Sequence, residues 1–393
     1  MRLLHTSDLH LGRSLNGHDL SAAQGAFLDR IVDAAIDRAV DVVLIAGDVY
    51  DRTLPPVESV VAFESFLVRL HALGIPVVVI SGNHDQAVRL GYGSALFQEG
   101  VHLLTDPARV HVPVELADEH GPVLVYGVPY LQPELTRRAL SDPDGPELPA
   151  THEAVVGAAM ARVRADLARR DGSPRVVVLA HAFVVGGEES PVVSTSERDV
   201  SVGGLQTVPS AVFAGAHYVA LGHLHGPQQP RAVGTGALLR YSGSPLRYSI
   251  SERDHSKSLT IVDLGPTGEV RVDEVLLPQP RPMADLRGTL VELLSDAHAQ
   301  HRQSWVRLTI TDSQRPDDLM RQLRDAFPHR VDVVFESARG HRAVASATVD
   351  HSSSPLDVAA EFIIAVRDVA MTDEERLLLG EVIAELEAGA LAR

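Results

Sequence analysis

The chain of 393 residues is 45% apolar and 22% charged, a composition typical of globular proteins and, at this length, of two or three domains. It has no cysteine, which excludes disulfides, thiolate metal sites and cysteine nucleophiles and fits a reducing compartment. The net charge of −17 argues against binding nucleic acid through bulk positive charge, although metal cations can neutralise phosphate locally in an acidic protein. Lys257 is the only lysine among 35 basic residues, which the base composition of the gene explains most simply.

The sequence contains no recognisable targeting or membrane-spanning segment. His5, Asp8 and His10 interrupt the first residues before the apolar part of a signal peptide could form. No run of about 18 apolar residues, the length needed to cross a bilayer, occurs later. We therefore expect a cytoplasmic protein with no membrane partner.

Short, β-branched apolar runs alternate with helical stretches over residues 1–265. The expected strands cover 2–7, 40–47, 75–82, 122–128, 175–181, 217–223, 259–264 and 269–277. The expected helices cover 21–39, 56–73 and 151–169. This alternation predicts an α/β layered core, whose functional sites lie beyond the carboxyl ends of strands.

The remaining residues divide into a small unit and a tail. A Pro-rich linker at 278–283 precedes an expected helix over 286–299, a strand over 305–310, a helix over 316–327 and a strand over 330–336. A second break at 352–355 precedes two short amphipathic helices, the second of which begins with a capping-box pair, Thr372 and Glu375. We therefore divide the chain into 1–277, 283–350 and 355–393.

Five short polar stretches each begin where an expected strand ends, and together they point to one shared site. They supply Asp8 and His10 (SDLH), Asp48, Asp51 and Arg52 (AGDVYDR), Asn83, His84 and Asp85 (SGNHD), His181 (VLAH), and His223 and His225 (GHLH). In an extended segment, His223 and His225 face the same side, roughly 6.5–7 Å apart. That spacing alone is compatible with one ion, two ions or none.

The number and type of side chains indicate a two-metal site. Carboxylate, imidazole and amide donors suit Mn²⁺, Fe or Zn²⁺ better than Ca²⁺. The candidate ligands are Asp8, His10, Asp48, Asn83, His181, His223 and His225, more than the roughly six positions around one ion can accept. If Asp48 bridges, they provide four donors to each of two ions. Two ions about 3.5–4 Å apart can lower the pKa of a shared water from about 15.7 to about 7, which predicts phosphoester hydrolysis without a protein nucleophile.

The residues that flank the candidate ligands have more than one interpretation. His84 is the candidate to protonate the leaving oxygen or to steady the phosphate. Asp51 is placed to orient His84, with Asp85 as its rival for that role or as a cap of the turn. Arg52 either contacts phosphate or is an ordinary surface arginine.

The motifs D-x-H, G-D, G-N-H-D, H and G-H-x-H occur here in the order of the calcineurin-like metallophosphoesterase signature, which the chain resembles over most of residues 1–250. The resemblance implies a layered β-sandwich flanked by helices. It assigns one ion to Asp8, His10, Asp48 and His225, and the other to Asp48, Asn83, His181 and His223. His84 matches the proton-donating histidine of the superfamily, whereas some relatives have a histidine at the position of Asp51.

The sequences around these motifs resemble one family in particular. LLHTSDLHLGRSL, GDVYDRTLPP, SERDVSVGG (196–204) and YSGSPLRYS (241–249) are similar to the SbcD family, the nuclease subunits of bacterial DNA-end-processing complexes. The resemblance implies a nucleoid-associated nuclease that cuts double-stranded ends and hairpins with two divalent ions, Mn²⁺ first and Mg²⁺, Fe or Zn²⁺ as alternatives. It also implies a DNA-capping domain at 283–350, an SbcC-like coiled-coil ATPase bound through 355–393, and a homodimer formed through 56–73 and 90–100.

Two other functions are compatible with parts of the sequence. A phosphatase or cyclic-nucleotide phosphodiesterase would need only residues 1–265, so the small unit and the tail count against it. A scaffold that had lost its metals should lack ligands, and none of the expected ones is missing.

Overall fold

The computed structural model describes residues 1–97, 100–142, 144–187, 191–200, 207–336, 354–367 and 371–390. Parts of several segments singled out above lie outside the described residues, namely 98–99, 201–204, 337–350, 352–353, 368–370 and 391–393. Among the described helices, none combines the length and the apolar character that crossing a membrane requires.

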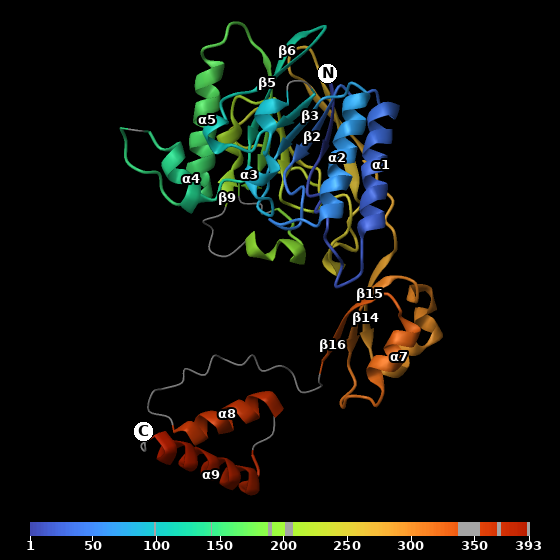
Figure 1. Cartoon of the computed structure of the whole chain (residues 1–393). Helices are drawn as coiled ribbons and strands as arrows, with labels where there is room; N and C mark the ends of the chain where they lie inside the picture. The colour runs from blue at the N-terminus through green and yellow to red at the C-terminus, as the bar shows by residue number, and fades with distance from the viewer. Residues whose placement is uncertain are drawn as a thin grey trace.

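Two sheets form the body of the molecule (Figure 1). The first has the order β13-β12-β1-β2-β3-β4, with β1 Arg2–Thr6, β2 Val42–Ala46, β3 Val77–Ile80, β4 Val101–Leu103, β12 Ser258–Leu264 and β13 Val270–Leu276. The second has the order β11-β10-β7-β6-β5, with β5 Val114–Asp118, β6 Gly121–Val128, β7 Arg175–His181, β10 Tyr218–Gly222 and β11 Leu238–Tyr241. A two-stranded pair, β8 Phe183–Val185 and β9 Thr207–Pro209, lies beside them.

The central strands are apolar throughout because both of their faces are covered. Alternate residues of a strand point to opposite faces, so Val42 and Leu44 of β2 pack in the core between the two sheets. Val43 and Ile45 of the same strand pack against the helices on the outer face. The whole of β2 is therefore buried.

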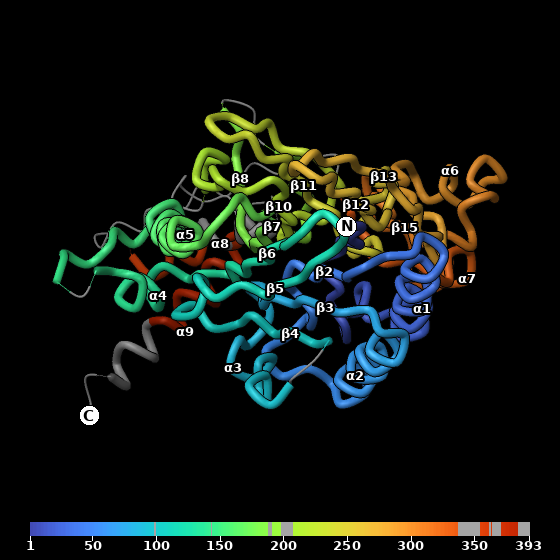
Figure 2. The backbone as a smooth tube through the Cα atoms, turned by 90° about the horizontal axis from the view of Figure 1, so that it is seen from above, coloured from blue at the N-terminus to red at the C-terminus, as the bar shows by residue number. Residues whose placement is uncertain are grey.

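Helices cover the outer faces of the two sheets. α1 Ser21–Asp37 and α2 Val57–Ala72 lie on one side of the strands and α5 His152–Leu167 lies on the other, beside α4 Pro133–Leu140, as the view from above shows (Figure 2). α2 buries Phe63, Phe66 and Leu70, which stand at helical spacing along one face. The predicted layered β-sandwich flanked by helices is confirmed.

The direction of the strands determines where a site can form. β1, β2 and β3 run parallel in the first sheet, and β6, β7, β10 and β11 run parallel in the second. β2 also packs against β7 and β10 across the sandwich. The carboxyl ends of these strands therefore meet at one rim, and the loops that leave them share one space.

The small unit has its own sheet and its own apolar core. β14 Met283–Gly288, β15 Trp305–Ile310 and β16 Arg330–Phe335 are parallel, with α6 Leu290–Leu294 and α7 Leu319–Ala326 packed on them. The expected helix over 286–299 is wrong at its start, because residues 283–288 form a strand whose alternate residues Ala284, Leu286 and Gly288 are buried. The helix begins at Leu290, where Thr289 and Glu292 form a capping box.

The small unit contacts the two-sheet body directly. Trp305 and Val331 belong to the apolar core that also contains α1 and α2. The side-chain amide of Asn16 donates to the carbonyl oxygen of Val331 at 2.6 Å. The two units are therefore packed against each other and not merely joined by the 278–283 segment.

The tail forms two helices, α8 Pro355–Arg367 and α9 Asp373–Ala390. The predicted capping box at the start of α9 is present, with Glu375 N donating to Thr372 Oγ1 at 3.2 Å and Thr372 N donating to Glu375 Oε2 at 3.0 Å. Arg376 of α9 bonds to Asp357 of α8 at 3.1 Å. The expected pair of tail helices is confirmed over the described residues.

Candidate metal centre

All seven expected ligands lie at the shared rim. Asp8 and His10 follow β1, Asp48 follows β2, and Asn83 follows β3. His181 is the last residue of β7, and His223 and His225 follow β10. Six of the seven are buried and Asn83 is exposed, so the group of ligands reaches the surface at the β3 loop.

The backbone is strained at four of these residues. Asp8, His10, Asp48 and His223 have φ values of 53°, 45°, 51° and 104°, in the left-handed region that L-residues rarely adopt. Hydrogen bonds between the β1 and β2 loops hold three of them, since Asp8 N donates to Gly47 O and His10 N donates to Asp48 O, both at 3.0 Å. Strain of about 1–3 kcal/mol per residue is characteristic of sites whose geometry is set by function.

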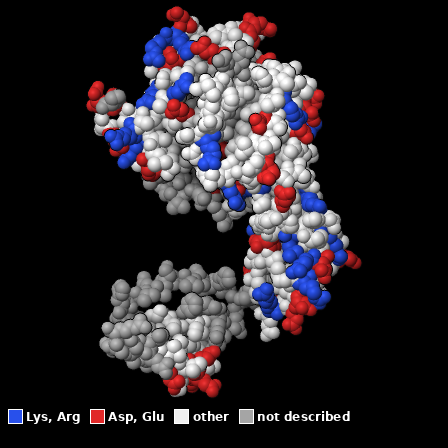
Figure 3. Space-filling view, in the orientation of Figure 1, with Lys and Arg blue, Asp and Glu red and all other residues white. Residues whose placement is uncertain are grey.

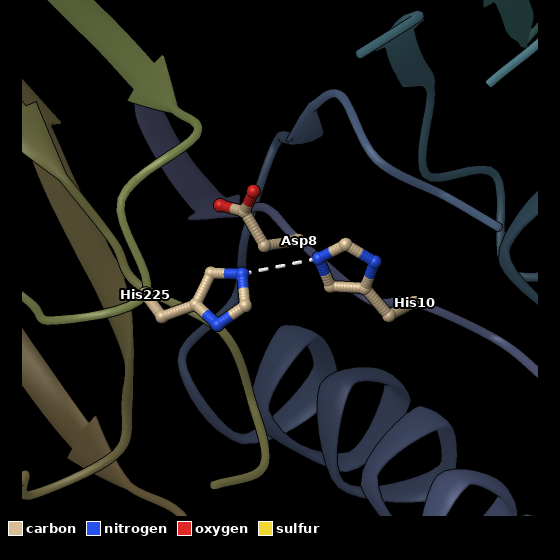
Figure 4. Close-up of side chains that lie close together, drawn as sticks. All are labelled: Asp8, His10 and His225. Atoms are coloured by element: carbon tan, nitrogen blue, oxygen red, sulfur yellow. Dashed lines mark hydrogen bonds between the residues drawn. The ribbon is translucent and has the colours of Figure 1, made fainter. Parts of the chain in front are cut away.

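Asp8, His10 and His225 form one group, with ligand atoms within 4.8 Å of one another (Figure 4). His10 Nε2 lies 3.1 Å from His225 Nε2, so these two nitrogens face each other across a small space. The carboxylate of Asp8 accepts from the backbone N–H of His223 at 3.1 Å and from Ser7 Oγ at 2.5 Å, which fixes its direction.

Asn83, His181 and His223 form the other group. Asn83 Oδ1 lies 3.0 Å from His181 Nε2 and 2.9 Å from His223 Nδ1, so one amide oxygen and two imidazole nitrogens converge. His181 Nδ1 donates to the carbonyl oxygen of Ala46 at 2.8 Å, which leaves Nε2 unprotonated on the side of the site.

Asp48 stands between the two groups. Its Oδ2 lies 3.7 Å from His10 Nε2 and 3.5 Å from His181 Nε2. Its Oδ1 accepts from the backbone N–H of His84 at 2.8 Å. A carboxylate oxygen within 4 Å of imidazoles from both groups is placed where a bridging ligand would lie.

Burial shifts the protonation of the whole cluster. Burial, and secondly the charge of Asp48, raise the pKa of Asp8 well above its usual range. The same two causes raise the pKa of Asp85 to about 7. Burial lowers the pKa of His10, His181 and His223, so these imidazoles are neutral and able to ligate metal. Buried carboxylates beside neutral imidazoles are the donor set of a divalent-metal site.

The residues around the ligands differ from their expected roles in detail. His84 Nδ1 donates to the backbone carbonyl of Asp51 at 2.8 Å, so the carboxylate of Asp51 does not make this contact. That carboxylate lies 3.6 Å from His10 Nδ1 and 3.7 Å from Arg13 Nε. The Asp85 carboxylate accepts three backbone N–H bonds, from Gly82, Val49 and Tyr50. Asp85 therefore caps the turn, as in the second of its two expected roles. The Arg52 side chain is 73% exposed and lies 3.7 Å from Asp51.

Several residues that support the site carry no motif in the sequence. Glu252 and Lys257 lie fully buried behind His225, together with Glu197 and the ring of Tyr248. Although burial acts to raise it, the charge of Lys257 holds the pKa of Glu252 below its usual range. The one sequence signal that could have pointed to this cluster is that Lys257 is the only lysine of the chain.

The fold and the site define a class of protein. A layered sandwich with a carboxylate and imidazole site at the strand ends is the arrangement of a metal-dependent phosphoesterase, and a family model described as calcineurin-like phosphoesterase matches residues 1–227. A second model, described as the type 5 capsule protein repressor C-terminal domain, matches residues 279–367.

The chain belongs to the calcineurin-like phosphoesterase family and, within it, to the SbcD family. It is 34% identical over 356 residues to the D subunit of the nuclease SbcCD of Bacillus subtilis (strain 168), and the match covers 87% of this chain and 88% of that protein. The crystal structure of TT1561 of Thermus thermophilus is 15% identical, with a TM-score of 0.39, and the match covers 70% of this chain and 98% of that one. A similarity that low supports no argument about the site.

Replacing Asp8 with Asn should separate stability from metal binding. The raised pKa of Asp8 means that ionising it costs the metal-free folded chain free energy, whereas the unfolded chain ionises it at about pH 4, the ordinary value for aspartate. The stability of the metal-free chain should therefore fall as the pH rises from that value toward the pKa of Asp8 in the folded state. In EDTA, Asp8→Asn should unfold at a temperature equal to or above that of the wild type. Its unfolding temperature should also depend less on pH.

Addition of metal should make the wild type unfold at a higher temperature than Asp8→Asn. An ion at about 100 times its Kd stabilises a folded protein by about 2.7 kcal/mol, and Asp8→Asn should lose that gain for at least one ion. Differential scanning calorimetry with EDTA and with Mn²⁺ measures both effects. Asp118→Asn is the control, because it breaks a partly buried ion pair with Arg175 elsewhere in the second sheet and should destabilise the chain in EDTA while keeping the gain from metal. A full metal-dependent gain in Asp8→Asn would contradict the role of Asp8.

Proposed function

We propose that the protein is a two-metal-ion DNA nuclease that cuts double-stranded ends and hairpins together with an SbcC-like ATPase in DNA repair and recombination. The position of Asp48 carries the proposal, because its carboxylate stands within 4 Å of imidazoles from both groups of ligands. The name of the Bacillus relative, a nuclease subunit, supports DNA as the substrate and a second subunit as the partner.

Each ion would be held by four side chains. The first set is Asp8, His10, Asp48 and His225, and the second is Asp48, Asn83, His181 and His223. Bound ions of this kind neutralise phosphate charge and lower the pKa of water. Mn²⁺ is our first choice because mixed carboxylate, imidazole and amide donors suit it, with Mg²⁺, Fe and Zn²⁺ as alternatives.

His84 is the residue of this chain placed to handle a proton. Since a carbonyl oxygen only accepts, the bond from His84 Nδ1 to Asp51 O places the proton on Nδ1 and turns Nε2 toward solvent or substrate. The ring lies 4.6 Å from that of His10, and the ligand atoms of His84, His10 and Asp48 lie within 4.8 Å of one another, so His84 stands beside the first group of ligands. Protonated at both nitrogens, it would donate from Nε2 to the leaving oxygen of the phosphodiester.

A cleft beside the first group offers a path for a DNA strand. It encloses about 330 Å³ between the body and the small unit, and its lining includes Arg13, Asn16, Ser196 and Arg307. The guanidinium of Arg13 lies 5.0 Å above the ring of Tyr248, which also packs against His10. We propose that residues 283–350 form a DNA-capping domain; in Figure 3 the basic side chains of the small unit lie among acidic ones, so contacts with DNA there would depend on individual arginines. Residues 1–277 would then form the nuclease domain.

A second copy of the chain is the partner we propose for the outer face of α2. Val57, Val61 and Val68 stand at helical spacing on this face and are 73%, 52% and 60% exposed. Val88, Tyr92, Leu96 and Phe97 of the neighbouring 87–97 segment are also exposed, and a cavity of about 570 Å³ lies between the two segments. A contiguous apolar surface of this kind is typical of a protein interface. We call it the α2 patch.

The tail offers a surface for the ATPase. Leu377, Leu378 and Val382 of α9 are 68%, 64% and 46% exposed, although α8 is packed on another side of the helix. Exposed apolar residues on an amphipathic helix are suited to a helical partner such as a coiled coil. We propose that residues 355–393 dock on the coiled-coil base of the SbcC-like subunit.

A phosphatase or cyclic-nucleotide phosphodiesterase is the less favoured function. The similarity to the nuclease subunit covers 87% of the chain, including the small unit that such an enzyme would not need. Within the part of the chain that the structure describes, no feature favours a small substrate specifically.

Replacing Asp48 with Ala should abolish hydrolysis, since the carboxylate shared by the two groups is lost. Wild type with Mn²⁺ should degrade linear duplex DNA and cleave bis(p-nitrophenyl) phosphate, and Asp48→Ala should lose at least about 1,000-fold in rate on both, since the loss of a metal site removes several kcal/mol of stabilisation. His84→Asn is the matched comparison, because it should lose turnover while retaining metal. Wild-type cleavage of the ester without cleavage of DNA would contradict the nuclease, and activity in Asp48→Ala would contradict the metal mechanism.

Charges on the α2 patch should prevent dimerisation. Val61→Glu combined with Val68→Glu would place two buried carboxylates in the interface, each costing several kcal/mol. Light scattering after size-exclusion chromatography should show a wild-type dimer and a monomeric variant. Leu135→Glu, at a residue of α4 that is 74% exposed, is the control and should remain dimeric. A monomeric wild type would contradict the assignment of the α2 patch.

Charges on the tail should release the ATPase without affecting the metal site. Leu378→Asp with Val382→Asp changes two residues four apart on α9, which lie on the same side of the helix. Co-expression with the SbcC-like ATPase of the same genome should yield a complex for wild type and for the control Val291→Asp, an exposed apolar residue of α6. The double variant should lose the complex and keep its metal content. A complex that survives would show that the tail does not provide the docking surface.

A further inference from the structure

A buried ion pair stands directly behind one of the candidate ligands. Lys257 and Glu252 have side chains with 0% exposure, and Lys257 Nζ lies 2.6 Å from Glu252 Oε2. The ammonium also donates to the carbonyl oxygen of His225 at 2.8 Å and to Ser244 Oγ at 2.9 Å. All three protons of the only lysine in the chain are therefore used.

The second oxygen of Glu252 faces the imidazole of His225. Glu252 Oε1 lies 3.1 Å from His225 Nδ1 and accepts from Ser196 Oγ at 2.5 Å. Because a carboxylate only accepts, the proton of His225 lies on Nδ1 and the lone pair lies on Nε2. That nitrogen points to Asp8 and His10, as Figure 4 shows.

The main chain of His225 is held by the same cluster. Its N–H donates to Glu197 Oε1 and its carbonyl oxygen accepts from Lys257, so the backbone is fixed on both sides of the ring. The ring of Tyr248 packs against that of His225, with centroids 5.9 Å apart. Direction, tautomer and position of this one imidazole are thus all determined by buried groups.

Within the described residues, the other group of ligands lacks this support. His181 donates to the neutral backbone carbonyl of Ala46. A carboxylate behind an imidazole raises the basicity of its ligating nitrogen more than a carbonyl does. The two groups of ligands therefore differ: a buried carboxylate contacts His225 in the first, and a backbone carbonyl contacts His181 in the second.

We propose that Glu252 and Lys257 are positioning residues that set the affinity of the first ion, the one held by Asp8, His10, Asp48 and His225. Glu252 fixes the tautomer of His225, and Lys257 holds Glu252 and the His225 backbone in place. The inference rests on the proposed two-ion function. It adds a physical reason why the two ions would bind with different affinities.

Glu252→Gln is the sharpest test, because it keeps size and shape. A glutamine must turn its amide N–H either toward the ammonium of Lys257 or toward Nδ1 of His225, and the second orientation moves the histidine proton to Nε2, where a metal would bind. Loss of such a partner weakens metal binding by about 10- to 100-fold. Isothermal titration with Mn²⁺ and metal content after gel filtration should show this loss for one ion and less than about a threefold change for the other. Lys257→Met should act in the same direction.

Two comparisons separate positioning from a general effect on stability. Asp118→Asn, in the remote ion pair with Arg175, should lower the melting temperature in EDTA and leave both affinities unchanged. In a His225→Ala background, Glu252→Gln should cause no further loss of affinity, because residues that act through one another are not additive. Fully additive losses would overturn the proposal, as would unchanged affinities in Glu252→Gln or an equal loss of both ions with the same fall in melting temperature as the control.

The titration of wild type keeps this proposal distinct from the proposed function. A wild type that binds one ion only would contradict the two-ion site. If Glu252→Gln then weakened that ion and had no effect in the His225→Ala background, the positioning role would stand. Wild-type binding of two ions with no effect of Glu252→Gln would overturn the positioning role alone.

Discussion

Negative charge buried at one rim is the constraint on which the rest of this structure depends. Asp8, Asp48 and Asp85 are at most 9% exposed, and burial disfavours the ionised forms of Asp8 and Asp85. Without cations, backbone N–H groups stabilise this cluster by donating hydrogen bonds to the carboxylates of Asp8 and Asp85. The positions of the strand ends, the left-handed backbone of the ligands and the neutral histidines all follow from assembling these carboxylates where divalent ions can neutralise them.

Close packing of the strand ends, between the two sheets at Gly222 and within the first sheet at Gly82, explains the glycines beside the ligands. A Cβ atom on Gly222 would overlap the carbonyl oxygen of Ala46, across the sandwich from β10. One on Gly82 would overlap the carboxylate of Asp48. Any larger residue would push the strand ends apart and enlarge the site. The Gly in GHLH and the Gly in SGNHD therefore have a steric role that is separate from the chemistry of the histidines and the asparagine.

The sequence predicted the layered fold and the gathering of the seven candidate ligands, because both depend on strands whose apolar runs are visible in one dimension. It could not predict contacts made by backbone groups, such as the Asp51 carbonyl beside His84. The cluster of Glu252 and Lys257 was also hidden, since it lies in a segment without periodicity and is defined only by its partners. The helix expected over 286–299 overlaps the end of the strand at 283–288, because a short apolar pattern fits both structures.

The charge of the chain limits how it can bind DNA. At a net charge of −17, long-range attraction to phosphate is unfavourable, so binding must depend on local groups. Many arginines are neutralised by carboxylates, as Arg307 is by Asp285 and Arg175 by Asp118. Metal ions held by the seven candidate ligands would then be the strongest positive charges at the rim. A partner that supplies a basic surface would remove this limit, which gives a physical reason for a nuclease subunit of this composition to work in a complex.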